Sequence, residues 1–251
     1  MLLAHDLHGR PDAPRAVLIH GITESRRAWD PLLDDLGASY RVLNVDLRGH
    51  GESDVVGPYD TMSYAGDVVE TMSATGFDGA GVVGHSLGGI VASAVGALGA
   101  ARRVVNIDQS IQLSGFKELV GSIEPQLRGD EATFRSTIEM VFAAMAGPLP
   151  AAEVARIEAL RSIRQEVVLG TWALLLESSE AELDATVQAV ATAITVPYLA
   201  LHGEDPGEGY ADWLRGLVPT ATVEVWADHG HYPHLVEPSR FVERLRGFLA
   251  D

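Results

Sequence analysis

The sequence predicts an α/β fold in which a doubly wound, mostly parallel sheet is covered by helices and carries an inserted helical cap. Short apolar runs rich in β-branched residues recur along the chain, and helical patterns separate most of them. Between residues 113 and 193, helix-type periodicity continues without a convincing strand. We therefore expect a core formed by residues 1–112 and 194–251 and a cap formed by residues 113–193.

The expected sheet consists of short buried strands with helices between most of them. The strands are residues 16–20, 40–46, 81–84, 104–108, 196–203 and 222–226. The accompanying helical patterns are residues 61–75, 87–99, 208–217 and 238–249. This alternation predicts parallel strands covered on both faces, with functional groups gathered at the carboxyl ends of the strands.

The expected cap is made of helices only. The segments with an apolar stripe at helical spacing are EATFRSTIEMVFAAMAG, AAEVARIEALRSI, QEVVLGTWALLLES and EAELDATVQAVATAI. No repeat of fixed period and no polar linker separates these segments from the rest of the chain. We therefore expect the cap and the core to belong to one folded unit.

The charge and composition of the chain exclude several kinds of partner. Among 251 residues, 35 acidic and 18 basic side chains give a net charge of -17, which repels nucleic acids and anionic membranes. The absence of cysteine rules out disulfides, thiolate nucleophiles and zinc-thiolate sites. Neither a secretory signal nor an apolar run of membrane-spanning length is evident, so we expect a cytoplasmic protein.

The stretch GVVGHSLGGIVASAVGALGA, residues 81 to 100, places a serine between a strand-like run and a small-residue helix. Gly84 and Gly88 flank Ser86 in G-x-S-x-G spacing. A strand that turns abruptly into a helix holds a hydroxyl above the sheet in a strained backbone conformation, and the glycines relieve the resulting crowding. Ser86 is therefore the candidate nucleophile.

A candidate base for Ser86 lies near the end of the sequence. A serine hydroxyl is a poor nucleophile at neutral pH and needs a base within hydrogen-bond reach. His231 lies in a turn after the last expected strand, in the segment ADHGHYPHLVEPSRFVERLRGFL, and is the candidate. His229 and His234 lie close by, but a turn has no fixed face on which to converge three ligands, so we expect no metal site.

Five motifs along the chain resemble those of α/β-hydrolase fold proteins, in the same order: HGITES, DLRGHGESD, GHSLGG, HGEDP and GHYPHLVEP. The chain is most similar to the serine-nucleophile members that carry a cap, such as esterases and lactonases, and the resemblance covers nearly all of it. It implies that His231 is the catalytic histidine. It also implies an oxyanion hole formed by the backbone N–H groups of Ile22 and Leu87, with Gly21 shaping the loop that carries Ile22.

The resemblance leaves two candidates for the acid that orients His231. In the family this acid usually stands three residues after the glycine that ends the penultimate strand, and three residues after Gly203 is Pro206. Asp205 stands one residue too early, although a proline follows it, as in the family. Some relatives carry the acid at the end of the preceding strand, where this sequence has Asp108. Both stay open, because the acid's requirement is geometric.

Large apolar side chains of the expected cap are candidates for contact with a substrate over Ser86. Met140 and Trp172 belong to this group, and Trp29, which follows the oxyanion loop, has similar status. The alternative is that these side chains form the core of the cap, because helical apolar stripes are usually core. The remaining members of the group are Phe116, Phe134, Phe142, Met145 and Leu176.

The resemblance implies a serine hydrolase that cleaves a small carboxylic ester or lactone with a substantial apolar part, through an acyl-enzyme on Ser86 and without a cofactor. Dehalogenases and epoxide hydrolases of this fold use aspartate at the position of Ser86, so the serine argues against both. Carbon–carbon bond hydrolases, perhydrolases and lyases keep the serine and stay open. A ligand-binding member of the fold without catalysis is the alternative from another functional class.

Overall fold

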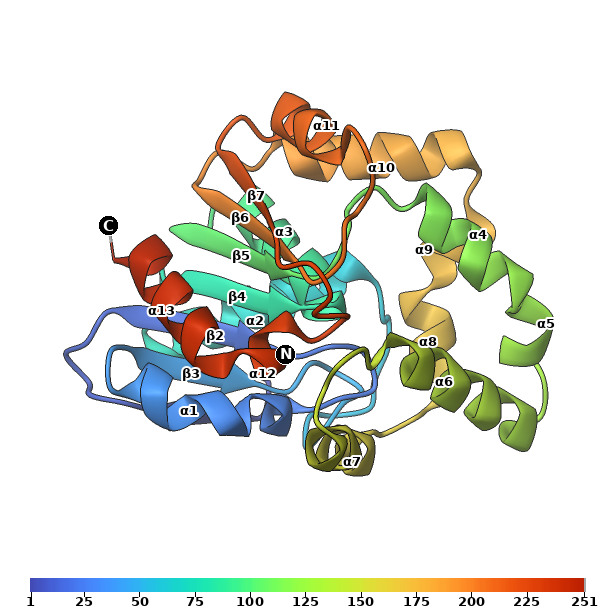
Figure 1. Ribbon diagram of the computed structural model, residues 1–251, viewed down its shortest axis with the longest axis horizontal. Coiled ribbons are helices and arrows are strands. Elements are labelled where there is room, and N and C mark those ends of the chain that lie inside the picture. The colour runs from blue at the N-terminus through green and yellow to red at the C-terminus, as the bar shows by residue number, and fades with distance from the viewer. Residues whose placement is uncertain (251) are drawn as a thin grey trace.

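A single sheet of seven strands forms the centre of the molecule in the computed structural model, which describes residues 1–250 (Figure 1). The strands are β1 (His5–His8), β2 (Arg15–Ile19), β3 (Arg41–Val45), β4 (Gly81–His85), β5 (Arg103–Ile107), β6 (Tyr198–His202) and β7 (Ala221–Val225). Their order is β1-β3-β2-β4-β5-β6-β7, and only β1 pairs antiparallel to its neighbour. The predicted mostly parallel sheet is therefore confirmed.

Helices cover both faces of the sheet, as the doubly wound topology requires. Helices α2 (Thr61–Thr75), α3 (Leu87–Ala97) and α11 (Tyr210–Leu217) share one apolar cluster with Val17 and Ile19 of β2. Helices α1 (Asp30–Gly37) and α13 (Pro238–Leu249) share the other cluster with Ala16 and Leu18. Alternate residues of one strand thus face opposite layers of the core.

Three elements near the start of the chain were not predicted from the sequence. Strand β1 has the sequence HDLH and pairs only with β3 at the sheet edge, with its residues half-buried or exposed. A polar edge strand of this kind has no apolar run to signal it. The short 3-10 helix η1 (Arg26–Trp29) and α1 follow β2 and were also absent from the expected elements.

Seven helices lie between β5 and β6: α4 (Ser114–Ser122), α5 (Glu124–Leu127), α6 (Glu131–Met145), α7 (Ala151–Leu160), α8 (Gln165–Thr171), α9 (Ala173–Glu177) and α10 (Glu180–Thr192). Figure 1 shows α4, α5, α6, α8 and α9 beyond the sheet, whereas α10 packs beside α3 and α11. The last helix of the expected cap therefore adds to the layer that covers the sheet. Within residues 1–250, no helix combines the length and the hydropathy needed to cross a membrane.

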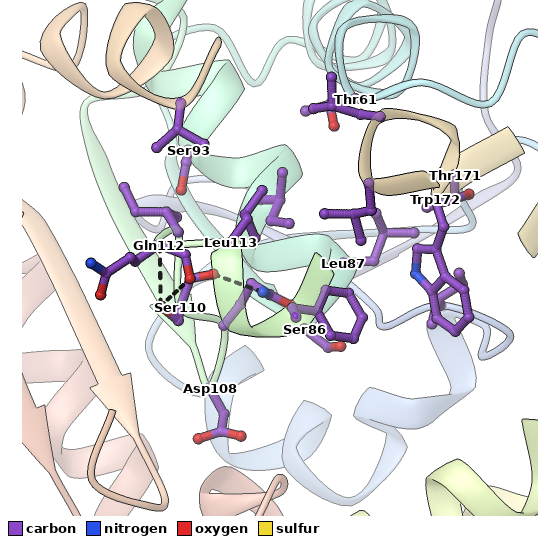
Figure 2. Close-up of a pocket in the computed structure, with 18 of the residues that line it drawn as sticks. Thr61, Ser86, Leu87, Ser93, Asp108, Ser110, Gln112, Leu113, Thr171 and Trp172 are labelled. Carbon is purple, nitrogen blue, oxygen red and sulfur yellow. Dashed lines mark hydrogen bonds between the residues drawn. The ribbon is translucent and has the colours of Figure 1, made fainter. Parts of the chain in front are cut away.

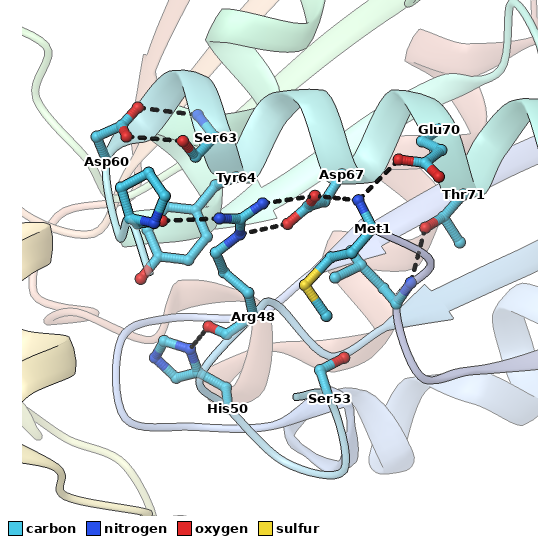
Figure 3. A network of polar contacts seen from close by, with 12 residues as sticks. Met1, Arg48, His50, Ser53, Asp60, Ser63, Tyr64, Asp67, Glu70 and Thr71 are labelled. Atoms are coloured by element: carbon cyan, nitrogen blue, oxygen red, sulfur yellow. Dashed lines mark hydrogen bonds and ion pairs between the residues drawn. The ribbon is translucent and has the colours of Figure 1, made fainter. Parts of the chain in front are cut away.

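A polar network ties the segment after β3 to α2 (Figure 3). Arg48 Nη2 donates to Asp67 Oδ1 over 2.7 Å, and its Nη1 donates to the carbonyl of Pro58. The backbone N–H of Leu3 donates to Thr71 Oγ1 on the same helix, over 3.0 Å. These contacts give Arg48 a structural part, away from the site described below.

The turn from β4 into α3 brings backbone atoms unusually close together. A Cβ atom added at Gly84 would lie 1.8 Å from the carbonyl oxygen of Gly88, and one added at Gly88 would lie 2.3 Å from the carbonyl oxygen of Ile19. Real side-chain atoms do not approach backbone so closely. Glycine is therefore required at both positions, and the start of α3 crosses directly above β2 and β4.

We expect Gly84→Ala to lower the free energy of unfolding by at least about 3 kcal/mol, because the added methyl group overlaps the backbone of Gly88. The control is Gly66→Ala in α2, where a Cβ atom would meet nothing within 4 Å. That change should raise the free energy of unfolding by about 0.5–1 kcal/mol. Urea unfolding of both variants measures the difference, and equal effects would contradict the steric argument.

Candidate active site

Ser86 lies in the turn between β4 and α3, at the carboxyl end of the sheet. Its backbone has φ 54 and ψ -122, a conformation that costs about 1–3 kcal/mol for a residue other than glycine. The Ser86 N–H donates to the carbonyl of Ile107 on the neighbouring strand, over 2.9 Å. The side chain lines a cavity beneath the helices between β5 and β6, so the predicted strand–turn–helix setting is present.

Asp108 and His231 form a direct contact in the same cavity. Asp108 follows β5, has φ 50, and its Oδ2 lies 2.6 Å from Nδ1 of His231, which comes from the loop after β7. Its other oxygen, Oδ1, accepts the backbone N–H of Gly203 over 2.7 Å. The carboxylate is thus fixed at both oxygens, and it holds the imidazole with a proton on Nδ1 and Nε2 free to accept one.

Asp205 lies apart from this pair. Its side chain is exposed, and Oδ1 accepts the N–H of Gly207 over 2.9 Å within its own loop. Of the two carboxylates that the sequence left open, the structure brings only Asp108 against His231. The loop after β6 turns toward solvent at Asp205, whereas Asp108 ends a central strand whose neighbour, β6, supplies the Gly203 contact.

Ser86 and His231 share the cavity, but Ser86 Oγ makes no hydrogen bond within residues 1–250. Contacts between a nucleophile and its base are often long in an empty site and shorten when a substrate is bound. The hydroxyl is therefore without a partner in the described residues, and Asp108 holds the imidazole through its Nδ1.

Burial and the contact between Asp108 and His231 shift the pKa of each group in opposite directions. Burial raises the pKa of Asp108, but the hydrogen bond and the charge of His231 outweigh it and hold that pKa below its ordinary value. Burial lowers the pKa of His231, and the hydrogen bond with Asp108 only partly opposes this effect. Near neutral pH the pair is therefore a carboxylate beside a neutral imidazole.

Ile22 and Leu87, the two residues expected to supply oxyanion donors, line the same cavity as Ser86. Ile22 follows β2 and Leu87 begins α3, and the ends of β2 and β4 are neighbours because Ile19 pairs with Gly84. Neither N–H has a hydrogen-bond partner in the described chain, residues 1–250. Two free donors beside a serine hydroxyl are suited to stabilise a negatively charged oxygen.

Hydrogen bonds of Gly21 and His20 hold the loop that carries Ile22 in place. The N–H of Gly21 donates to Glu24 Oε2 over 3.3 Å, and Gly21 itself does not line the cavity. His20 Nε2 accepts the N–H of Leu47 over 3.0 Å, so its Nδ1 carries the proton given to the carbonyl of Gly21. Gly21 therefore takes part in the hydrogen bonds of the loop and does not line the cavity.

Glu24 is the centre of a buried polar network beneath this loop. Its Oε1 accepts the hydroxyl of Tyr232 over 2.8 Å, and Arg161 Nη2 donates to the same hydroxyl. Burial raises the pKa of Glu24, but His85, Arg161 and Tyr232 together hold it well below the ordinary value. Since Arg161 also donates to Thr23 Oγ1, the segment after α7 is fastened to the loop that carries Ile22.

The cavity has a volume of about 620 Å³ and is mostly apolar. Figure 2 shows Ser110 and Gln112 on one side of Ser86, with Thr171 and Trp172 on the other. The apolar lining includes Ile90, Leu113, Phe116, Phe142, Met145, Leu174, Leu175 and Val187. Apart from Asp108 and His231, no lining residue is acidic, basic or a histidine.

Two residues expected near the substrate lie elsewhere, whereas Trp172 lines the cavity. Met140 is 62% exposed, because Ile138 and Phe142, two positions away on either side in α6, point inward. Trp29 is buried in the opposite layer of the core, where its ring lies 5.0 Å from that of His234. These two expectations were wrong, because the sequence shows that a side chain is apolar but not which layer of the fold it joins.

Some lining residues were missed from the sequence. Gln109, Ser110 and Gln112 follow Asp108 directly and line the cavity. The rule that functional groups gather after the carboxyl ends of strands could have pointed to them. Thr61, at the start of α2, carried no such signal.

The three neighbouring histidines do not converge. His229 Nδ1 bonds with the carbonyl of Ala227, and His234 is buried against Trp29. Across residues 1–250, no group of three histidine, aspartate or glutamate side chains is arranged to hold a metal ion.

A comparison with known protein families finds one family model that matches most of the chain. A family model described as "Alpha/beta hydrolase family" matches residues 16–244. A solved structure described as a hydrolase from Pseudomonas aeruginosa PA01 superimposes with a TM-score of 0.77 at 23% identity, covering 99% of this chain and 94% of that one.

Curated relatives include enzymes named for ester and lactone substrates. The 3-oxoadipate enol-lactonase 1 of Acinetobacter baylyi is 22% identical over 98% of this chain and 92% of its own length. The pimeloyl-[acyl-carrier protein] methyl ester esterase of Photobacterium profundum is 27% identical over 93% of each chain. The polyketide synthase ThaQ of Burkholderia thailandensis is 28% identical over 95% of this chain, which spans only 12% of the length of that protein.

We expect the pKa of His231 to lie below 6.5, because burial disfavours the imidazolium. In Asp108→Asn the pKa should fall further, since the carboxylate that favours the imidazolium is gone. Titration of the His231 ring signals by NMR measures both values. Asp205→Asn is the control and should leave the pKa of His231 unchanged, because Asp205 does not contact the ring. A pKa above 6.5 in the unaltered protein would contradict the expectation.

Proposed function

Because the chain belongs to the alpha/beta hydrolase family, we propose that it is a serine hydrolase that cleaves a neutral carboxylic ester or lactone through an acyl-enzyme on Ser86. The observation that carries this proposal is the 2.6 Å contact of Asp108 with His231 in the cavity that Ser86 lines. The relatives named as an enol-lactonase and a methyl ester esterase support ester and lactone chemistry.

In the first half of the reaction, His231 acts as a base. Its Nε2 takes the proton of Ser86 Oγ as that oxygen attacks the substrate carbonyl, and Asp108 stabilises the imidazolium that forms. The carbonyl oxygen becomes an oxyanion that the N–H groups of Ile22 and Leu87 stabilise. The imidazolium then gives its proton to the leaving alkoxy oxygen as the carbon–oxygen bond breaks, which leaves the acyl group on Ser86.

In the second half, a water molecule replaces the alcohol. His231 takes a proton from this water as the water oxygen attacks the acyl carbonyl, and it returns the proton to Ser86 Oγ when the acid leaves. Because burial lowers the pKa of His231 from its ordinary value, the neutral form that accepts a proton in both halves is favoured near neutral pH. No redox or cofactor step is required.

The helices over the sheet supply the substrate enclosure. We assign residues 113–193 as a cap on the core formed by residues 1–112 and 194–251, with α10 also serving as part of the core layer. Trp172 and Phe116 from this segment lie edge to face, with ring centroids 5.7 Å apart, on the wall of the cavity. Such a wall removes water from an apolar acyl or alcohol group.

We expect Ser86→Ala to abolish both hydrolysis of 4-nitrophenyl esters and covalent labelling by a fluorophosphonate, because the acylated oxygen is gone. Asp108→Asn should lower kcat about 10⁴-fold, since an amide favours the wrong tautomer of His231. Asp205→Asn is the matched control and should stay close to the unaltered protein. Absence of a Ser86 adduct, or a large loss of activity in Asp205→Asn alone, would contradict the proposal.

The lining also bears on the charge of the substrate. It contains no lysine or arginine, and its only carboxylate is Asp108. A carboxylate on the substrate would lose its hydration here without gaining a cation, which costs several kcal/mol. The net charge of -17 adds a long-range repulsion of anions. The cavity is therefore suited to neutral substrates.

We expect 4-nitrophenyl hexanoate to be cleaved at least about 100-fold faster, in kcat/KM, than the mono-4-nitrophenyl ester of adipic acid, which has the same chain length and a terminal carboxylate. The methyl 4-nitrophenyl diester of adipic acid controls for length and should be cleaved well. Initial rates at pH 7 and low salt provide the comparison. Equal values for the charged and neutral substrates would overturn the assignment of a neutral substrate.

A further inference from the structure

A second cavity lies between α6 and α7, on the far side of the wall of the first. Its volume is about 500 Å³, close to that of the first. The interior is lined by apolar side chains that include Leu149, Val154, Ile157 and Ile163. Three charged residues of the lining, Arg135, Glu139 and Glu158, are exposed, and a fourth, Arg161, has a buried side chain.

Phe142 is the one residue that lines both cavities. Its side chain is buried in α6, one helical turn before Met145, whose carbonyl accepts the backbone N–H of His231 over 3.2 Å. His231 lines the first cavity, and the next residue, Tyr232, lines the second. The partition between the cavities therefore lies beside the proposed catalytic histidine.

Arg161 holds the ring of Phe142 from the side of the second cavity. Its guanidinium carbon lies 3.7 Å from the centroid of the ring, a favourable cation–π distance. The same guanidinium is fixed by Thr23 Oγ1 and the hydroxyl of Tyr232, each over 2.8 Å. The ring of Phe142 is thus held between the two cavities by a side chain that is itself hydrogen-bonded to Thr23 and Tyr232.

We propose that Phe142 is a specificity-determining residue that limits the length of the apolar chain of the substrate, by closing the first cavity against the second. This inference rests on the proposed hydrolysis of neutral esters. Removal of the ring would join two cavities of similar volume and nearly double the space beside Ser86. A longer chain would then pass Arg161, contact the apolar side chains of the second cavity and end near the exposed Arg135 and Glu139.

The test compares kcat/KM for 4-nitrophenyl esters from butanoate to hexadecanoate. In Phe142→Ala, the ratio of the value for the hexadecanoate to that for the butanoate should rise at least about tenfold over the unaltered protein, because added methylenes gain an apolar site. Phe142→Leu provides a variant of milder volume change if the alanine variant unfolds, and it should shift the ratio in the same direction.

A variant in which a large side chain fills the second cavity distinguishes this explanation from a general loosening of the cap. Ala143 lines the second cavity and is exposed, so Ala143→Trp should block it and remove the gain when combined with Phe142→Ala. Ala144 is also exposed and lines neither cavity, and the double variant with Ala144→Trp should keep the gain.

The outcomes distinguish the two levels of the proposal. An unaltered protein without a Ser86 adduct and without hydrolysis of short esters refutes the proposed function itself. If that protein is active but the ratio does not change in Phe142→Ala or Phe142→Leu, the role of Phe142 is refuted. A gain that persists in Phe142→Ala/Ala143→Trp also refutes it, because the second cavity then plays no part.

Discussion

The close approach of α3 to β2 and β4 is the constraint on which the site depends. Because Gly84 and Gly88 have no side chains, the helix begins directly above the strands and forces Ser86 into its positive φ. Ile22 and Leu87 follow β2 and β4, which are neighbours in the sheet, and both residues line the same cavity as Ser86. These three residues therefore lie at the carboxyl end of the sheet, at the point where the strand order changes direction.

The second requirement is an imidazole delivered from far along the chain. Asp108 and Gly203 end adjacent strands, and their hydrogen bond fixes the carboxylate that meets His231. Gly203 also lies so close to Gly230 that a Cβ atom there would be 1.9 Å from the Gly230 carbonyl oxygen. Contacts with the residues that follow two adjacent strands thus fix the loop that carries the histidine, which favours a preorganised site.

Polar contacts below the cavity join the helices of residues 113–193 to the core. The N–H of Ser162 donates to the carbonyl of Thr23 over 2.7 Å, beside the Arg161 contact with the same residue. The loop that carries Ile22 is consequently held by hydrogen bonds with Glu24 and with the segment after α7. The segment after α7 and the loop that carries Ile22 are therefore joined by one buried network, which also supports the ring of Phe142.

The sequence by itself determined strands β2 to β7, helices α2, α3, α11 and α13, and the tight turn at Ser86, because apolar periodicity and glycine spacing act over short stretches of chain. It did not determine the polar edge strand β1, which has no apolar run. Only the tertiary structure decided between Asp108 and Asp205, and placed Met140 and Trp29 away from the cavity. Those outcomes depend on how loops and layers meet in space, and no local pattern of residues encodes the distance between side chains far apart in the chain.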